Sequence, residues 1–167
     1  MKAPKPATEF SLWRHEHLFN IEFAAYTLSH HSFPRHFHDH YVIELVLEGA
    51  DSFYCDGKNY VAADGQLVLI NPGEVHTGST IDDTTLRYFS FYPGKKALEQ
   101  IAETLHINLP ADLNFRETLQ NCSSVTGKIR SLFDSLHSGT GIAAQQEYFF
   151  DCMQELLKQP EKTGMEF

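Results

Sequence analysis

Short apolar segments separated by strong turn signals fill the first half of the chain, and their spacing is what most restricts its fold. Asp56-Gly57, a strong short signal for a β-hairpin, joins the segments Ser52–Cys55 and Tyr60–Ala62. Asn71-Pro72-Gly73 and Pro93-Gly94 mark two further turns. The other segments that we predict as strands are Phe19–Thr27, Tyr41–Glu48, Gln66–Ile70 and Leu86–Tyr92. Strands repeated about every ten residues predict an antiparallel sandwich or barrel.

The periodicity becomes helical after Gly94. Apolar residues recur every three or four positions in the stretches 97–105, 125–136 and 142–157. The chain is therefore predicted to be mainly β, with two or three α-helices at its C-terminal side. We divide it into an N-terminal arm (1–10), a barrel (11–94) and a helical dimerisation or linker region (95–160).

The last helical stretch carries an apolar stripe formed by Phe149, Cys152, Met153 and Leu156. A two-fold pairing of this helix with its copy would place the same stripe on both sides, as a symmetric dimer requires. We predict that the stripe mediates a homodimer. The alternative, that it packs on its own barrel or on the helix at 125–136, stays open.

The charge of the chain argues against nucleic-acid binding by this segment alone. The formal net charge is −9, with 13 basic and 22 acidic residues and no basic stripe. Binding to DNA or RNA draws most of its affinity from Lys and Arg that neutralise phosphates. Such binding is therefore expected only through another domain on a longer polypeptide.

The cysteines and the hydropathy indicate the compartment. Cys55, Cys122 and Cys152 are odd in number and widely spaced, which is not typical of a disulfide framework or a zinc knuckle. No run of 18 apolar residues is present, and the first residues do not resemble a signal peptide. We expect a cytoplasmic protein without a membrane partner.

Histidines alternate in the segment Pro34-Arg-His36-Phe-His38-Asp-His40. Alternate residues of a strand share a face, so His36, His38 and His40 can point together. The spacing resembles the first motif of the cupin family, H-x-H-(x3–4)-E-(x6)-G. His36, His38 and Gly49 match it, and Val42 stands where that motif has its metal-binding glutamate.

The second cupin motif, G-(x5)-P-x-G-(x2)-H-(x3)-N, is also matched in part. Gly65, Gly73 and His76 have its spacing, whereas Asn71 replaces the proline and Thr80 replaces the asparagine. Two partly matched motifs in register, 16 residues apart, make the resemblance specific. It implies a cupin or jelly-roll β-barrel over residues 11–94.

The local sequence is more similar to one branch of that fold. Residues 33–78, FPRHFHDHYVIELVLEGADSFYCDGKNYVAADGQLVLINPGEVHTG, and the following RYFSFYP resemble the effector-binding domain of AraC-family regulators. The resemblance is close over 33–93 and looser to about 158. It implies a small effector bound in the barrel, dimerisation through C-terminal helices, and DNA binding by a helix-turn-helix domain expected after residue 160.

The departure at Val42 bears on metal binding. Metal cupins use about four protein ligands, and Val42 removes the anionic one. Glu44 is two residues further on, about 6.6 Å along a strand, which is too far for a simple replacement. We expect no cofactor, although His36, His38 and His76 can form a three-histidine site. A metal-dependent cupin dioxygenase or isomerase, and a dimerisation module with a filled barrel, remain the alternatives to an effector sensor.

The predicted ligand-binding residues combine hydrogen-bonding and charged side chains near the expected barrel mouth. They are His36, His38, Tyr41, Glu44, His76, Arg87 and Tyr88. Arg87 and Tyr88 are neighbours, so they cannot both face the interior unless the strand is bulged. No catalytic residue is predicted, because the chain lacks a G-x-S-x-G, a P-loop or a G-x-G-x-x-G motif.

Overall fold

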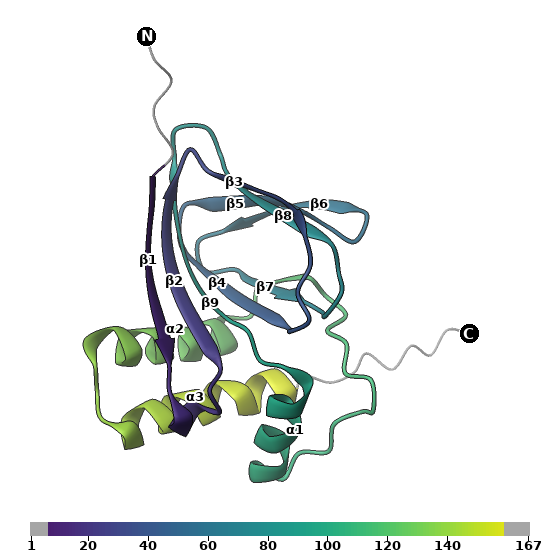
Figure 1. The fold of residues 1–167 in the computed structure, drawn as a ribbon, viewed down its shortest axis with the longest axis vertical. Helices are drawn as coiled ribbons and strands as arrows, with labels where there is room; N and C mark the ends of the chain where they lie inside the picture. Colours follow the sequence, from purple (N-terminus) through teal and green to yellow (C-terminus); the bar gives the residue numbers. More distant parts are fainter. Residues whose placement is uncertain (1–6, 159–167) are drawn as a thin grey trace.

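The structure, a computed structural model, describes residues 7–158, whose strands form two antiparallel sheets that face each other (Figure 1). The six-stranded sheet has the order β1-β2-β9-β4-β7-β10, and the four-stranded sheet has the order β3-β8-β5-β6. The strands are β1 Ala7–Arg14, β2 Glu22–Ser29, β3 Ser32–His36, β4 Val42–Glu48, β5 Ala50–Cys55, β6 Lys58–Ala63, β7 Leu67–Ile70, β8 His76–Thr80, β9 Thr85–Phe91 and β10 Leu119–Gln120.

Three α-helices follow the first nine strands, and β10 lies between the first and second helix, which confirms the predicted class of mainly β structure with C-terminal helices. They are α1 Lys95–Thr104, α2 Ser123–Ser138 and α3 Ile142–Leu157, and a short 3-10 helix, η1 Glu16–Leu18, connects β1 to β2. Figure 1 shows α2 and α3 side by side beneath the six-stranded sheet, with α1 next to them. The helices therefore cover the sheet face that points away from the four-stranded sheet.

The hairpin predicted at Asp56-Gly57 is confirmed. Cys55 of β5 pairs with Lys58 of β6, so the turn between them consists only of Asp56 and Gly57. Both have positive φ, 45° for Asp56 and 85° for Gly57, as the tight hairpin turn that matches strand twist requires. Local turn chemistry thus sets the register of this hairpin.

The N-terminal segment differs from its prediction in two ways. Residues 7–10, assigned to a loose arm, belong to β1, which pairs with β2 along its whole length; residues 1–6 lie outside the described part of the chain. The predicted strand Phe19–Thr27 begins only at Glu22. Phe19 and Asn20 have left-handed backbone angles (φ of 58° and 52°) that a strand cannot include.

The six-stranded sheet has two apolar faces, which β4 illustrates. Ile43 and Leu45 point toward the helices and join a large core formed with α1, α2 and α3. Val42 and Val46 point the other way, into a second cluster between the two sheets. Successive side chains of a strand alternate between faces, so one strand serves both cores.

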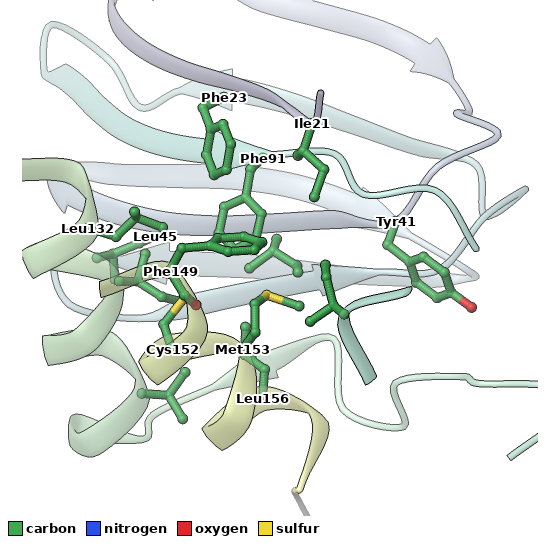
Figure 2. Packing of buried hydrophobic residues seen from close by; sticks show 14 of the residues in the cluster. Ile21, Phe23, Tyr41, Leu45, Phe91, Leu132, Phe149, Cys152, Met153 and Leu156 are labelled. Carbon is green, nitrogen blue, oxygen red and sulfur yellow. The ribbon is translucent and has the colours of Figure 1, made fainter. Parts of the chain in front are cut away.

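The predicted dimerisation stripe lies inside the larger core, and this prediction is corrected. Phe149, Cys152, Met153 and Leu156 are each at most 2% exposed within the single chain. Figure 2 shows them on α3 among side chains of the six-stranded sheet such as Leu45. The sheet face needs an apolar cover, and α3 supplies it, so the stripe is not accessible to a second copy.

Candidate ligand-binding site

A cavity of about 330 Å³ lies between the two sheets. Its volume falls at the lower end of the range of small-molecule sites. Apolar side chains from β2, β4, β5, β7 and β9 form much of its wall. The polar residues that line it are Tyr26, His36, His38, Glu44, Asp51, His76, Thr77, Ser79, Tyr88 and Tyr92.

Five of the seven predicted ligand-binding residues lie together in this lining: His36, His38, Glu44, His76 and Tyr88. Strand alternation explains two of them. Glu44 shares the interior face of β4 with Val42 and Val46, and Tyr88 is paired with Val46 on β9. The other two predicted residues, Tyr41 and Arg87, lie elsewhere, so their assignment to the cavity is corrected.

Tyr41 belongs to the core on the helix side of the sheet. Its ring packs edge-on against Phe115, and its hydroxyl donates a 2.7 Å hydrogen bond to the carbonyl oxygen of Leu113. Burial raises the pKa of Tyr41. The residue precedes β4, where the chain enters the sheet, and it anchors the 113–115 segment instead of contacting a ligand.

Arg87 lies on the outer face of β9. It pairs with Glu48 at 3.5 Å, and both side chains are about half exposed. An irregularity in the pairing of β4 with β9, between Val46 and Glu48, sets Arg87 opposite Glu48 while its neighbour Tyr88 stays inside. The interior of the barrel therefore receives a tyrosine from this strand and no arginine.

Three histidines converge at one part of the cavity wall. One ligating nitrogen each of His36, His38 and His76 lies within 4.8 Å of the others. Nδ1 of His36 is 2.7 Å from the carbonyl oxygen of Pro34, and Nδ1 of His76 is 2.9 Å from that of Glu74. A ring that donates Nδ1–H to a carbonyl keeps the lone pair on Nε2 for a ligand or a metal.

The histidine cluster favours neutral rings. Burial, with smaller contributions from the charges of His36 and His38, lowers the pKa of His76 to about 4, although the hydrogen bond to Glu74 opposes this shift. Burial, together with the charges of His36 and His40, also lowers the pKa of His38. His40, which the alternation placed with the others, is exposed and lies against Gly94.

The three imidazoles fit a transition metal as a donor set. A metal held by His36, His38 and His76 would supply Lewis-acid chemistry at the cavity. Val42, at the position of the anionic cupin ligand, lines the same cavity and offers no donor atom. The site therefore provides three neutral ligands from these positions and lacks the fourth.

Two carboxyl groups face the cavity from opposite sheets, Glu44 from β4 and Asp51 from β5. Oδ1 of Asp51 accepts a 3.0 Å hydrogen bond from the backbone N–H of Ser79. Burial raises the pKa of Asp51 to about 6, an effect that this hydrogen bond opposes. Burial raises the pKa of Glu44 well above its usual range, and the negative charge of Asp51 raises it further.

The lining also contains Asp51, Tyr26 and Tyr92, which were not among the predicted ligand-binding residues. The rings of Tyr26 and Tyr88 stack with centroids 5.1 Å apart, and the hydroxyl of Tyr92 is 2.7 Å from that of Ser90. A signal for Asp51 existed in the alternation of β5, where Asp51, Phe53 and Cys55 are the buried residues. An acidic residue in that buried series marks an interior polar position.

Residues 18–158 match the AraC-like ligand binding domain, which covers most of the chain. The chain belongs to this family. A relative in Bacillus subtilis (strain 168), the uncharacterized HTH-type transcriptional regulator YbfI, is 27% identical over 130 residues, which are 75% of this chain and 46% of the relative. The AraC-like chain thus spans about half the length of that regulator.

Solved structures with cupin folds are similar to part of the AraC-like chain. A cupin superfamily protein from Desulfitobacterium hafniense DCB-2 has a TM-score of 0.49 and 7% identity, over 57% of this chain and 84% of that protein. A cupin-like protein from Thermotoga maritima has a TM-score of 0.48 and 18% identity, over 54% and 71%. In residues 7–158, no helix has the length and apolar character to cross a membrane.

Proposed function

We propose that this AraC-like domain is the effector-sensing part of a cytoplasmic transcription regulator and that its role is binding, not catalysis. The observation that carries the proposal is the cavity between the sheets. It combines an apolar wall with ten polar residues that line one space of about 330 Å³. Concave, largely apolar sites with a few convergent polar groups are typical of small-molecule binding.

DNA contact is proposed for a separate helix-turn-helix domain of a longer protein. The net charge of −9 leaves this chain without the basic surface that phosphate binding needs. The match to an HTH-type regulator of about twice the matched length supports the same division of roles. In this proposal the present chain does not retard duplex DNA at physiological salt, and a specific shift that weakens with salt would contradict it.

The connection between the cavity and the helices runs through β9. Tyr88 lines the cavity, whereas its neighbour Phe89 points to the other face and packs against Phe133 of α2, with ring centroids 5.3 Å apart. A ligand that shifts Tyr88 also shifts Phe89, because the two residues share a backbone. Such coupling is typically about 1–3 kcal/mol, which is enough to bias a regulatory equilibrium.

A homodimer remains part of the proposal, although the buried stripe of α3 does not form its interface. Sedimentation of the chain over a range of micromolar concentrations tests it. A concentration-dependent dimer supports the proposal, and a monomer throughout contradicts it for this segment.

The direct test of sensing is a thermal-shift screen of metabolites. A ligand at 100 times its dissociation constant adds about 2.7 kcal/mol to the free energy of unfolding. We expect a compound that raises the melting temperature of the wild type and binds less tightly to His76→Ala. That substitution is expected to weaken binding more than it lowers stability. Unchanged affinity in His76→Ala would assign His76 a structural role.

The histidine cluster favours a second candidate function, a metal-dependent enzyme at the same cavity. Because Val42 replaces the anionic ligand, we expect protein purified without added metal to contain far less than one equivalent of Fe, Mn, Ni or Zn. Elemental analysis measures this directly. A stoichiometric metal that is lost together with His76 in the His76→Ala variant would support the enzyme instead of the sensor.

A further inference from the structure

Glu44 holds a buried oxygen without a partner. Among the residues that the structure describes, Oε1 of Glu44 is the one buried side-chain nitrogen or oxygen that makes no hydrogen bond. Leaving a polar atom buried and unpaired is costly, because it has lost its bonds to water and gained none. An atom of this kind, on a residue that lines a cavity, marks a position where a ligand supplies the missing donor.

Asp51 adds a second carboxyl to the same space. Its Oδ1 accepts a hydrogen bond from the Ser79 backbone, yet burial still raises its pKa to about 6. The charge of Asp51 in turn raises the pKa of Glu44, so the two carboxyls interact electrostatically. Two acidic groups in one poorly solvated space cannot both ionise easily without a compensating charge.

No lysine or arginine balances this pair within the cavity, because neither residue type occurs among the described residues of its lining. Arg87 pairs with Glu48 on the outer face, and Arg35 lies outside the lining, 4.6 Å from the centre of the Tyr54 ring.

The cavity wall near the carboxyls is aromatic. Tyr26 and Tyr88 present a stacked pair to the cavity, and Phe33, Phe53 and Tyr92 complete this part of the lining. Aromatic faces attract cations through their quadrupole, and they also accommodate the apolar body of an organic ligand. A neutral polyol would hydrogen-bond to the carboxyls, whereas a cation would also stabilise their ionised forms.

We propose that the effector is a small organic cation, a protonated amine, whose nitrogen binds between Glu44 and Asp51 against the aromatic wall. This inference rests on the proposed sensing function and narrows it to one chemical class. The ammonium group donates to Oε1 of Glu44 and supplies the charge that the cavity lacks. Charge-assisted hydrogen bonds of this kind are about twice as strong as neutral ones.

The test compares probes that share a carbon skeleton and differ in the polar group. The first set is 1,4-diaminobutane, 1,4-butanediol and succinate, and the second is 2-phenylethylamine, 2-phenylethanol and phenylacetate. Melting temperatures are measured with each probe at millimolar concentration, and calorimetric titration at pH 7 gives the affinity. We expect at least one amine to bind and to raise the melting temperature, while its matched alcohol and carboxylate do not.

Two variants on the same strand locate the binding. Glu44→Gln keeps the size of the side chain and removes its charge, and it is expected to weaken amine binding by at least about tenfold. Glu48→Gln is the matched control, because Glu48 lies on β4 outside the cavity, and it is expected to bind as the wild type does. Asp51→Asn provides a second cavity variant if Glu44→Gln folds poorly.

The outcomes separate the two proposals. Binding of a diol or a carboxylate in the cavity, without binding of an amine, overturns the cationic ligand and leaves the sensing function standing. Amine binding that is equally strong in Glu44→Gln and Asp51→Asn overturns the assigned position. If no probe of either set binds, the cationic ligand is overturned, and the metabolite screen decides the sensing function separately.

Discussion

The two faces of the six-stranded sheet differ in what they bury. Toward the helices, Ile43, Phe89 and Phe91 are fully buried among apolar side chains of α2 and α3. Toward the four-stranded sheet, their neighbours Glu44 and Tyr88 line a cavity that holds polar groups with shifted pKa values. Adjacent residues of one strand therefore serve opposite purposes: the helix face supplies stability, and the cavity face retains groups that only a ligand satisfies.

The largest expected effect concerns α3. Leu156→Asp places a carboxylate in the core on the helix side, where Leu156 is 2% exposed. We expect a loss of at least about 3 kcal/mol of unfolding free energy, because a cavity is created and an unpaired charge is buried. Thermal unfolding followed by circular dichroism measures this. A variant that stays folded with an unchanged melting temperature and changes from dimer to monomer in sedimentation would return the stripe to a dimer interface.

Substitutions of two neighbouring residues on β4 compare the stability that each face of the sheet contributes. Ile43→Ala removes packing on the helix side and is expected to cost about 2–4 kcal/mol. Glu44→Leu removes the unpaired oxygen on the cavity side and is expected to leave the ligand-free stability unchanged or to raise it by about 1 kcal/mol. Urea unfolding of both variants gives these values. Equal destabilisation by the two substitutions would mean that the two faces are not distinct.

The pH dependence of stability gives a smaller effect, from Asp51. Its pKa is about 6 in the folded protein against a usual value of 3.8, so between these pH values the folded state holds the extra proton. The contribution of Asp51 to the unfolding free energy therefore falls as pH rises from 4 to 6. Asp51→Asn removes this contribution.

Relative to the wild type, Asp51→Asn is thus expected to gain about 1–3 kcal/mol between pH 4 and pH 6. His76, with its pKa lowered to about 4, acts in the opposite direction, because its unfolded state binds the extra proton in that range. Both proteins contain His76, so its contribution cancels when the unfolding free energy of the wild type is subtracted from that of the variant. Denaturant unfolding at several pH values measures it, and a constant difference would show that Asp51 titrates normally.

Local signals predicted much of the fold. The turn at Asp56-Gly57 and the strand over 42–48 follow from residues close in sequence, and the three helical periods identify α1, α2 and α3. Strands β3 and β8 escaped prediction, because Ser32–His36 and His76–Thr80 are mostly polar and pair with each other across a long interval. Their pairing nevertheless brings His36 beside His76, as the motif spacing implied.

The candidate site could be predicted where the alternation of side chains along a strand was known. Glu44 and Tyr88 lie inside, and the regular alternation of β9 places Arg87, the neighbour of Tyr88, on the other face. Tyr41 was predicted to line the cavity, but it enters the helix-side core with the distant 113–115 segment. A contact between residues far apart in sequence therefore determines the position of Tyr41.

A cavity-filling variant tests whether a small molecule binds inside the cavity. Val68 lines the cavity and is 2% exposed, whereas Val61 on β6 is 53% exposed and is the matched control. The measurement is the ligand-induced rise in melting temperature of Val68→Phe, Val61→Phe and the wild type. We expect the rise to be lost in Val68→Phe, provided that this variant is folded, and to be kept in Val61→Phe. An equal rise in all three proteins would place binding outside the cavity.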